Sequence, residues 1–425
     1  VTVADFRNSS LSSERISLVW FRQDLRLADN PALSAAAAAG QVLPVYILDD
    51  INAGDWKMGS ASRAWLNGSL QALDRSLEGK LQFFRGDAGA IIETLVESLP
   101  IDAVYWNRCY EPWRIERDAQ IKSALAERGI EAHSYNASLL WEPWTVSKGD
   151  GTPYRVFTPY YRKGCLSQPA PRQPLDRPRA LRLVEPAAVN SVPLATLALL
   201  PAPDWHRNML KDWEIGEQAA QRGLESFCAS ALDIYREGRD FPATAATSRL
   251  SPHFHFGELS PQQAWHRIDN AAMHVAGDGP GHFLRELAWR EFSYYLLYHF
   301  PQLPERNFNP RFDDFQWLGD NQGLEAWQRG LTGFPIVDAG MRELWQTGYM
   351  HNRVRMIVAS FLIKNMLLHW RTGADWFWDC LVDADLASNS ASWQWCAGSG
   401  ADAAPYFRIF NPVLQSEKFD PQGEY

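Results

Sequence analysis

The sequence predicts an α/β plus all-α fold, with a doubly wound parallel sheet in an N-terminal domain, a long linker and a C-terminal domain of packed helices. Short β-rich runs alternate with helical patterns from residue 16 to about 140, and the pattern beyond the linker is helical almost throughout. Strands that alternate with helices imply right-handed crossovers and therefore a parallel sheet. A length of 425 residues also favours two or three domains over one.

Five runs are predicted as strands of the N-terminal sheet. They span residues 16–21, 42–48, 81–84, 103–106 and 132–135, and the helices between them include residues 62–77 and 114–126. Such a sheet binds ligands at the carboxyl ends of its strands, but the sequence has neither a G-x-G-x-x-G motif nor a P-loop. We place this domain at residues 15–145.

The stretch from Gln168 to Pro203 contains eight prolines and few aromatic residues, which is typical of a surface linker without packed elements. We therefore place an interdomain linker at residues 146–210 and a helical domain at residues 211–425. Twelve of the 19 tryptophans lie from Trp205 onward. Because indole buries a large surface, any one of them alone is best explained as part of a core.

The composition excludes several classes of protein. No apolar run approaches the roughly 18 residues that span a bilayer, and the first 14 residues lack the regions of a signal peptide. The five cysteines are widely separated and no Cys/His cluster has metal-ligand spacing, so we expect neither disulfides nor a metal site. A net charge of -9 argues against a protein that coats nucleic acid, although a local basic face can still bind phosphates.

Two segments of the C-terminal half carry polar groups on a defined helix face. In residues 281–300, Phe283, Glu286 and Arg290 recur at i, i+3 and i+7 and share one face. Taken alone, that face is more readily explained by a buried ion pair or a partly solvated helix edge. In residues 350–370, Asn352, Arg355 and Met356 lie away from an apolar stripe of Val354, Ile357, Val358, Phe361 and Leu362.

Two further segments carry groups that suit a ligand. Asp383 and Asp385 cannot share one helix face, so we expect them where a helix ends and the chain turns. Asp385 could bind a hydroxyl or a sugar and Asp383 could pair with Arg355, but capping is the commoner role of Asp at such a place. Residues 247–252 supply hydroxyls and backbone N–H groups just before a helical stretch, which suits a phosphate cradle but is weak evidence alone.

Several long strings of the sequence resemble the photolyase/cryptochrome family, and most closely its bacterial cyclobutane pyrimidine dimer photolyases. They are W-F-R-Q-D-L-R-L-A-D-N at 20–30, T-S-R-L-S-P at 247–252, E-L-A-W-R-E-F at 286–292, T-G-F-P-I-V-D-A-G-M-R at 332–342, M-H-N-R-V-R-M at 350–356, and D-A-D-L-A-S-N at 383–389 with G-A-D-A-A-P-Y-F-R-I-F-N-P at 400–412. The resemblance covers residues 16–425. It implies an antenna domain followed by a helical domain that holds FAD.

The resemblance implies roles for individual residues. Those that match FAD contacts of the family are Tyr235, Thr247, Ser248, Leu250, Ser251, Phe283, Arg290, Asn352, Arg355, Asp383, Asp385 and Asn389. Hydroxyls and N–H groups suit a diphosphate, carboxylates suit a ribose or adenine, and an arginine suits a reduced, anionic flavin ring. Trp393, Trp370 and Trp317 match an electron-hopping chain from the flavin to the surface.

The residues that match the substrate side point to a flipped-out pyrimidine dimer. Trp289 and Trp395 match its aromatic wall, Glu286 matches a carboxyl that stabilises the pyrimidine radical anion, and Met356 matches a thioether in the same cavity. Candidates for contacts to DNA phosphates at the rim are Arg239, Arg353 and Arg408.

The resemblance thus implies an enzyme that repairs cyclobutane pyrimidine dimers in UV-damaged DNA with light, as a cytoplasmic monomer that meets the nucleoid only when on DNA. The alternative is a cryptochrome-type blue-light photoreceptor or a (6-4) photolyase. Asn389 favours repair, because plant-type cryptochromes carry Asp there, and Met356 with Trp395 favours the cyclobutane dimer. The implied antenna is a reduced folate (MTHF) or 8-hydroxy-5-deazaflavin. Glu111 and Trp113 could contact it, or could simply close the edge of the sheet.

Overall fold

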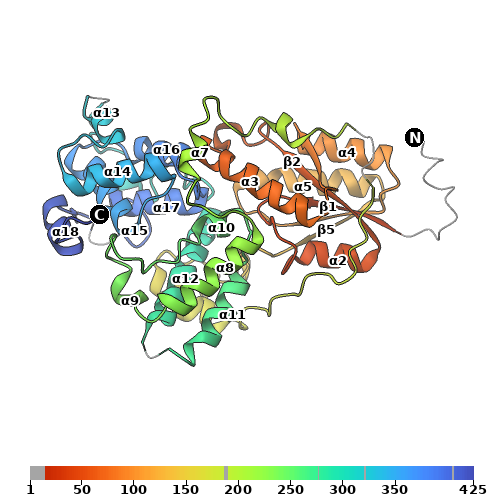
Figure 1. The fold of residues 1–425 in the computed structure, drawn as a ribbon, viewed down its shortest axis with the longest axis horizontal. Helices are drawn as coiled ribbons and strands as arrows, with labels where there is room; N and C mark the ends of the chain where they lie inside the picture. Colours follow the sequence, from red (N-terminus) through yellow and green to blue (C-terminus); the bar gives the residue numbers. More distant parts are fainter. Residues whose placement is uncertain (1–14, 186–189, 276, 320–321, 404–405) are drawn as a thin grey trace.

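The computed structural model describes residues 15–185, 190–275, 277–319, 322–403 and 406–425. Its N-terminal part is a parallel sheet covered by helices and its C-terminal part is helical, which confirms the predicted fold class (Figure 1). The boundaries at residues 145 and 211 stay predictions.

The sheet has five parallel strands in the order β3-β2-β1-β4-β5. The strands are β1 (Ile16–Phe21), β2 (Gln41–Leu48), β3 (Gln82–Arg85), β4 (Ala103–Asn107) and β5 (Glu131–Tyr135). The predicted strands agree with these bounds to within one residue at each end. The crossover helices are α2 (Pro31–Ala39), α3 (Ser60–Ser76), α4 (Ala88–Ser98) and α5 (Pro112–Glu127).

Alternate residues of the central strand β1 face opposite sides of the sheet, as a pleated strand requires. Val19 and Phe21 pack in one core with α2 and α3, whereas Leu18 and Trp20 pack in a second core with α4 and α5. Because both faces are covered, the strand is apolar except at the buried Ser17, rather than alternating in polarity.

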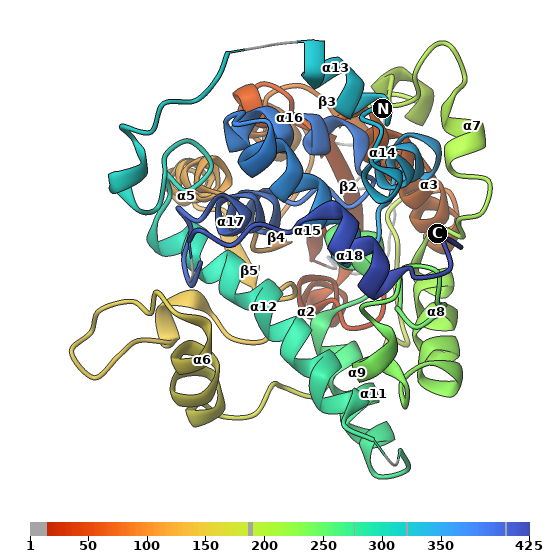
Figure 2. The same cartoon turned by 90° about the vertical axis from the view of Figure 1, so that its left-hand side faces the viewer.

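The C-terminal part is built around the 21-residue helix α12, which packs against α9, α11 and α17 (Figure 2). The helices beyond the sheet are α6 (Phe157–Pro159), α7 (His206–Met209), α8 (Glu217–Ser230), α9 (Tyr235–Gly238), α10 (Ser251–His255), α11 (Pro261–Ala272), α12 (Gly279–His299), α13 (Gln322–Gln328), α14 (Pro335–Thr347), α15 (Asn352–Ser360), α16 (Trp370–Cys380), α17 (Leu386–Ala397) and α18 (Pro412–Phe419).

Residues 350–370 do not form the single helix that their periodicity indicates. Helix α15 ends at Ser360, a π-helical turn follows over Phe361–Asn365, and α16 begins only at Trp370. Leu367 has a left-handed backbone with φ of 57°, and the His369 side chain caps α16 by accepting from the Arg371 N–H. The apolar stripe nevertheless lies in the core as predicted, because the π-helical turn keeps Phe361 and Leu362 buried.

The proline-rich segment is more closely packed than a surface linker. Leu183 pairs with Val42 and Val192 pairs with Phe83 as isolated β-bridges, and Leu197 and Leu199 are buried in the core beside α3. The expectation of an unpacked linker is therefore wrong for this part, because apolar side chains between the prolines are buried against the N-terminal domain.

The two domains are joined by buried polar contacts. The Arg26 guanidinium donates to the carbonyl of Gly257 in the helical domain at 2.8 Å and, within its own domain, to that of Ala137 at 2.9 Å. Gly257 has φ of +65°, and a Cβ there would lie 2.1 Å from the Gln23 carbonyl oxygen, so the close approach requires glycine. Among the described residues, no helix combines the length and apolarity that crossing a membrane requires.

Candidate functional site

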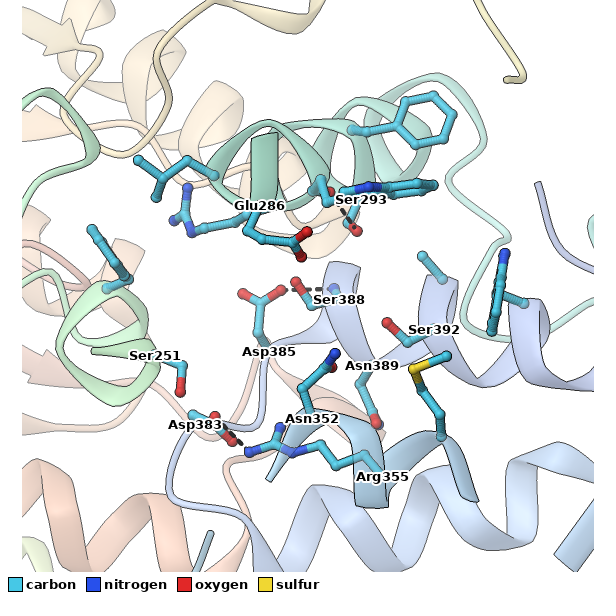
Figure 3. A pocket seen from close by; sticks show the side chains of 18 of the residues that line it. Ser251, Glu286, Ser293, Asn352, Arg355, Asp383, Asp385, Ser388, Asn389 and Ser392 are labelled. Atoms are coloured by element: carbon cyan, nitrogen blue, oxygen red, sulfur yellow. Dashed lines mark hydrogen bonds and ion pairs between the residues drawn. The ribbon is translucent and has the colours of Figure 1, made fainter. Parts of the chain in front are cut away.

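A cavity of about 770 Å³ opens among α9, α10, α12, α15, α16 and α17 in the helical domain. Most of the residues predicted to act together line it, although they come from segments up to 160 positions apart. They are Tyr235, Ser248, Ser251, Phe283, Arg290, Asn352, Arg355, Asp383, Asp385 and Asn389 among the predicted cofactor contacts, and Arg239, Glu286, Trp289, Arg353, Met356, Trp393 and Trp395 among the others. Figure 3 shows Glu286 reaching from α12 toward Asp385, Asn352 and Asn389 on the opposite side.

Five predicted residues do not line the cavity. Thr247 and Leu250 belong to the turn before α10; Thr247 is half-buried, and Leu250 is buried in the core, so only the backbone of Leu250 could face a ligand. The Arg408 guanidinium lies 5.9 Å from the centre of the Trp395 ring, outside the lining. Trp370 is buried in the core and Trp317 is half-buried at its edge.

Helix α12 presents its polar face to the cavity, as the i, i+3, i+7 spacing predicts. Glu286 forms an ion pair with Arg239, the residue that ends α9. The same guanidinium lies 5.3 Å from the centre of the Tyr235 ring. The predicted phosphate contact and the predicted substrate carboxyl thus hold one another in this structure.

Arg290, one turn beyond Glu286, is held by contacts of its Nη1 atom to the protein. Its guanidinium donates to the Ser138 carbonyl at 2.7 Å and lies 3.3 Å from a Glu291 carboxylate oxygen. Burial opposes its charge, but the neighbouring Tyr294, Glu291 and Asp385 raise the pKa of Arg290. A permanent positive charge therefore lies at the wall of the cavity.

Asp385 caps α17 and also contacts two other elements. It accepts from the Ser388 N–H at 2.8 Å and from the Tyr294 hydroxyl, and His255 Nδ1 lies 3.7 Å from its second oxygen. Burial alone would raise its pKa, but His255, Arg290 and Tyr294 hold the pKa of Asp385 below its ordinary value. The capping role that we weighed against ligand binding is present, and the carboxylate also lines the cavity.

Arg355 and Asp383 form the predicted ion pair, with Nη2 to Oδ2 at 2.9 Å, and Arg355 Nε donates to the Met350 carbonyl at 2.7 Å. Asp383 Oδ1 is buried and has no partner among the described residues. A buried carboxylate oxygen without a donor is costly, so this atom is suited to a ligand N–H or hydroxyl. The Asn389 amide donates to the Ala374 carbonyl at 3.0 Å, which fixes its orientation beside the cavity.

Tryptophan rings form two walls of the cavity. Trp289 stacks on Phe157 with ring centroids 3.8 Å apart and an interplanar angle of 10°. Trp395 is held by a hydrogen bond from its Nε1 to the Asp402 carbonyl at 3.1 Å. Both rings are half-buried, so each keeps a face for an aromatic ligand.

Of the three tryptophans of the predicted relay, only Trp393 lines the cavity. Trp370 is buried, and His369 lies between Trp370 and Trp317 with ring centroids at 5.5 and 5.4 Å. Trp370 Nε1 donates to Asn307 Oδ1 at 3.0 Å. Their role in electron transfer stays a prediction.

Sequence reasoning missed several polar groups of the site. Tyr294 lies four residues after Arg290 on the same helix face, so the periodicity of α12 could have identified it. His255 lies at the end of α10, and Asp240 pairs with Arg353 at 2.7 Å. No spacing signal connects Asp240 to α15, because the contact depends on how the two segments pack.

A second cavity, of about 40 Å³, lies at the carboxyl ends of β1 and β2. Trp20, Trp113 and Arg117 line it, and Arg117 lies 4.6 Å from one ring centre and 5.0 Å from the other. Glu111 lies outside this lining and pairs with Arg114 at 3.4 Å. Within the described residues, no group of three His, Cys, Asp or Glu side chains could hold a metal ion.

Two family models match the chain: DNA photolyase over residues 17–179 and the FAD binding domain of DNA photolyase over residues 283–425. The chain is 49% identical to a deoxyribodipyrimidine photo-lyase of Agrobacterium fabrum, over 96% of this chain and 85% of that protein. It is 37% identical to cryptochrome-1 of Arabidopsis thaliana, over 98% of this chain and 63% of that protein. The crystal structure of a bacterial class III photolyase from Agrobacterium tumefaciens matches with a TM-score of 0.93 and 48% identity, over 99% of this chain and 87% of that chain.

Proposed function

The chain belongs to the DNA photolyase family, and from this premise we propose that it is a deoxyribodipyrimidine photo-lyase that repairs cyclobutane pyrimidine dimers in UV-damaged DNA. The observation that carries the proposal is the convergence of Glu286, Trp289 and Trp395 on the same cavity as the Arg355–Asp383 pair. One part of the cavity suits a flavin cofactor and the other suits a flat, apolar substrate with a polar edge.

The residues of the cavity fit FAD. A volume of about 770 Å³ lies within the range of roughly 300–1,000 Å³ that is usual for cofactor pockets. Asp383 Oδ1 offers a buried acceptor to a ribose hydroxyl or an adenine amino group, and Ser248 and Ser251 offer hydroxyls to a diphosphate. Arg290 and Arg355 supply the positive charge that a reduced, anionic flavin ring requires.

When bound and reduced, FAD supplies the electron that splits the dimer after it absorbs light. The protein binds and orients the lesion. Trp289 and Trp395 offer ring faces to the flipped-out pyrimidines, and Glu286 offers a carboxyl to their polar edge. Arg239 and Arg353 lie where the phosphates of the lesion strand would approach the rim.

Repair of a UV-irradiated oligothymidine by the reduced protein tests this proposal. We expect thymine absorbance to recover under blue light and to remain unchanged in matched darkness. Glu286→Ala should fold and bind flavin but lose much of its repair yield per absorbed photon. Unchanged yield in Glu286→Ala would remove this carboxyl from the substrate site.

The specific alternative is a blue-light photoreceptor, which the 37% identity to a plant cryptochrome favours. Light-dependent recovery of thymine absorbance would reject it. A protein that binds and reduces flavin but repairs neither dimers nor (6-4) lesions would establish it and reject dimer repair. The monomeric state and the cytoplasmic location stay predictions.

We also propose a reduced folate as the antenna chromophore, with a deazaflavin as the alternative. The cavity at the carboxyl ends of β1 and β2, at about 40 Å³, is far smaller than a tricyclic ring. A folate pterin or a deazaflavin there would each need the Trp113 and Arg117 side chains to move apart, so the cavity volume favours neither chromophore. The absorbance and fluorescence of the chromophore released on denaturation would distinguish the two.

A further inference from the structure

The rim of the large cavity carries two neighbouring ion pairs, and each engages an arginine predicted to contact DNA. Arg239 pairs with Glu286 of α12, and the next residue, Asp240, pairs with Arg353 of α15 at 2.7 Å. In the protein without DNA, both arginines are therefore held by carboxylates of the protein itself. Any phosphate that reaches them must compete with those carboxylates.

The Arg239–Glu286 pair concerns the site most directly, because both side chains line the cavity and Glu286 points into it (Figure 3). The side chain of Arg239 is 15% exposed and that of Glu286 is 33% exposed, so solvent and a ligand can reach both. A guanidinium carries five N–H donors in a planar fork that binds a carboxylate or a phosphate with the same geometry. The pair can therefore be exchanged without moving the helices.

The charge of the whole chain makes such an exchange consequential. With a net charge of -9, the protein has little long-range attraction for DNA, so affinity must come from local arginines. At this rim, however, the carboxylates of Glu286 and Asp240 neutralise the charges of the two arginines until DNA binds. The cost of breaking these pairs is then part of the free energy of binding.

We propose that Arg239 exchanges partners during substrate binding: it holds Glu286 in the free protein, and a phosphate of the lesion strand takes the guanidinium and releases the carboxyl toward the flipped-out bases. The inference rests on the proposed function and adds a positioning role for Arg239. Glu286 is thereby kept from its substrate role until the DNA backbone is bound. Binding of the DNA backbone and release of the Glu286 carboxyl are thus coupled through the Arg239 side chain.

A double-mutant cycle tests the exchange. Glu286→Gln keeps the shape and hydrogen bonding of the side chain but frees Arg239, so affinity for a dimer-containing oligothymidine should rise about two- to fivefold. Arg239→Gln should lower affinity about tenfold and reduce the slope of log K against log salt by about 1. In the Arg239→Gln background, Glu286→Gln should no longer raise affinity.

The exposed pair of Glu325 on α13 and Arg329 just beyond its end, at 3.0 Å, supplies matched controls. Glu325→Gln and Arg329→Gln remove the same charges far from the rim, and each should change affinity less than about twofold. Arg239→Lys keeps the charge without the planar fork and should retain most of the salt slope. Flavin content and melting temperature of each variant show whether it is folded.

Equal effects of Glu286→Gln in both backgrounds, or an effect no larger than that of Glu325→Gln, would overturn the exchange. If Arg239→Gln fails to fold, the Glu286→Gln result on the otherwise unchanged chain still decides, because weaker or unchanged binding contradicts a competing carboxylate. Failure of the proposed function would be seen separately, as absence of light-driven repair by the unaltered protein. If the unaltered protein repairs dimers but the effects of Glu286→Gln and Arg239→Gln on affinity are additive, the partner exchange is rejected and the proposed function stands.

Discussion

Gly373→Ala is a small change with a calculable consequence for the site. Gly373 lies on α16, one turn beyond Trp370, where the helix passes directly over Trp393. A Cβ at this position would lie 2.1 Å from Cη2 and 2.4 Å from Cζ3 of Trp393, and 2.6 Å from Cδ2 of Leu362. Because carbon atoms in contact are ordinarily separated by about 3.5–4.0 Å, the indole must move by more than 1 Å, or roughly 1.4 Å at its tip.

The surroundings of Trp393 resist that movement. Its ring packs edge-on against Phe377 with centroids 4.9 Å apart and against Trp327 at 6.3 Å. Overpacking of this kind costs about 1–3 kcal/mol, and the helix preference of alanine over glycine returns about 1 kcal/mol. With three atoms under 2.7 Å from the new methyl group, we expect the upper end, a net loss of about 2 kcal/mol.

Thermal unfolding and flavin photoreduction measure the two consequences of Gly373→Ala. The melting temperature should fall by about 3 °C or more, and photoreduction should slow because Trp393 is the first predicted relay residue beside the cavity. Gly89→Ala on α4 is the matched control, since its methyl group meets Asp87 Oδ1 only at 3.2 Å. An unchanged melting temperature in Gly373→Ala would refute the packing argument, and a lower melting temperature with an unchanged photoreduction rate would refute the relay.

Three other predictions follow from single contacts. Asp383→Asn leaves Arg355 without its carboxylate and should raise the dissociation constant of FAD about tenfold, measured by the fluorescence of released flavin. Trp370→Phe should slow photoreduction but leave repair by protein reduced beforehand unchanged, and a loss of both would contradict a relay role. Burial, opposed by Arg290 and two backbone N–H groups, raises the pKa of Glu291 from 4.5 to about 7. Between these two pH values the folded protein keeps a proton on Glu291 that the unfolded chain loses. The contribution of Glu291 to the free energy of unfolding is therefore fully present below pH 4.5 and is lost as the pH rises to about 7. Melting at pH 5 and pH 7.5 should show a larger decrease for the unaltered protein than for Glu291→Gln.

Local patterns in the sequence were sufficient for the sheet and for the polar faces of the site helices. The strands were identifiable because short β-rich runs alternate with helical patterns. Both faces of the sheet are covered, so every residue of β1 but Ser17 is apolar. The polar face of α12 was identifiable because Phe283, Glu286 and Arg290 obey the helical period. The same period includes Tyr294, four residues after Arg290.

What the sequence could not supply are the partners that packing brings together. Arg239 and Glu286 are separated in the chain by a turn, two helices and a loop, so no spacing rule predicts their ion pair. The break of residues 350–370 into α15, a π-helical turn and α16 was missed because its signal is a left-handed residue, Leu367, which has no glycine or asparagine to mark it. Leu197 and Leu199 lie among prolines, whose turn signal masked the buried positions between them.

The N-terminal domain contributes no described residue to the lining of the large cavity, and yet it orients the helix that carries the site. Arg290 donates to the Ser138 carbonyl at 2.7 Å, and the adjacent Glu291 accepts from the backbone N–H groups of Leu140 at 2.7 Å and Trp141 at 3.4 Å. These contacts fix the rotation of α12 about its axis. Since Glu286 lies one turn before Arg290, the same rotation directs its carboxyl into the cavity. The segment after β5 that contains Ser138, Leu140 and Trp141 therefore does more than connect two domains. It sets the direction in which the proposed substrate carboxyl of Glu286 faces.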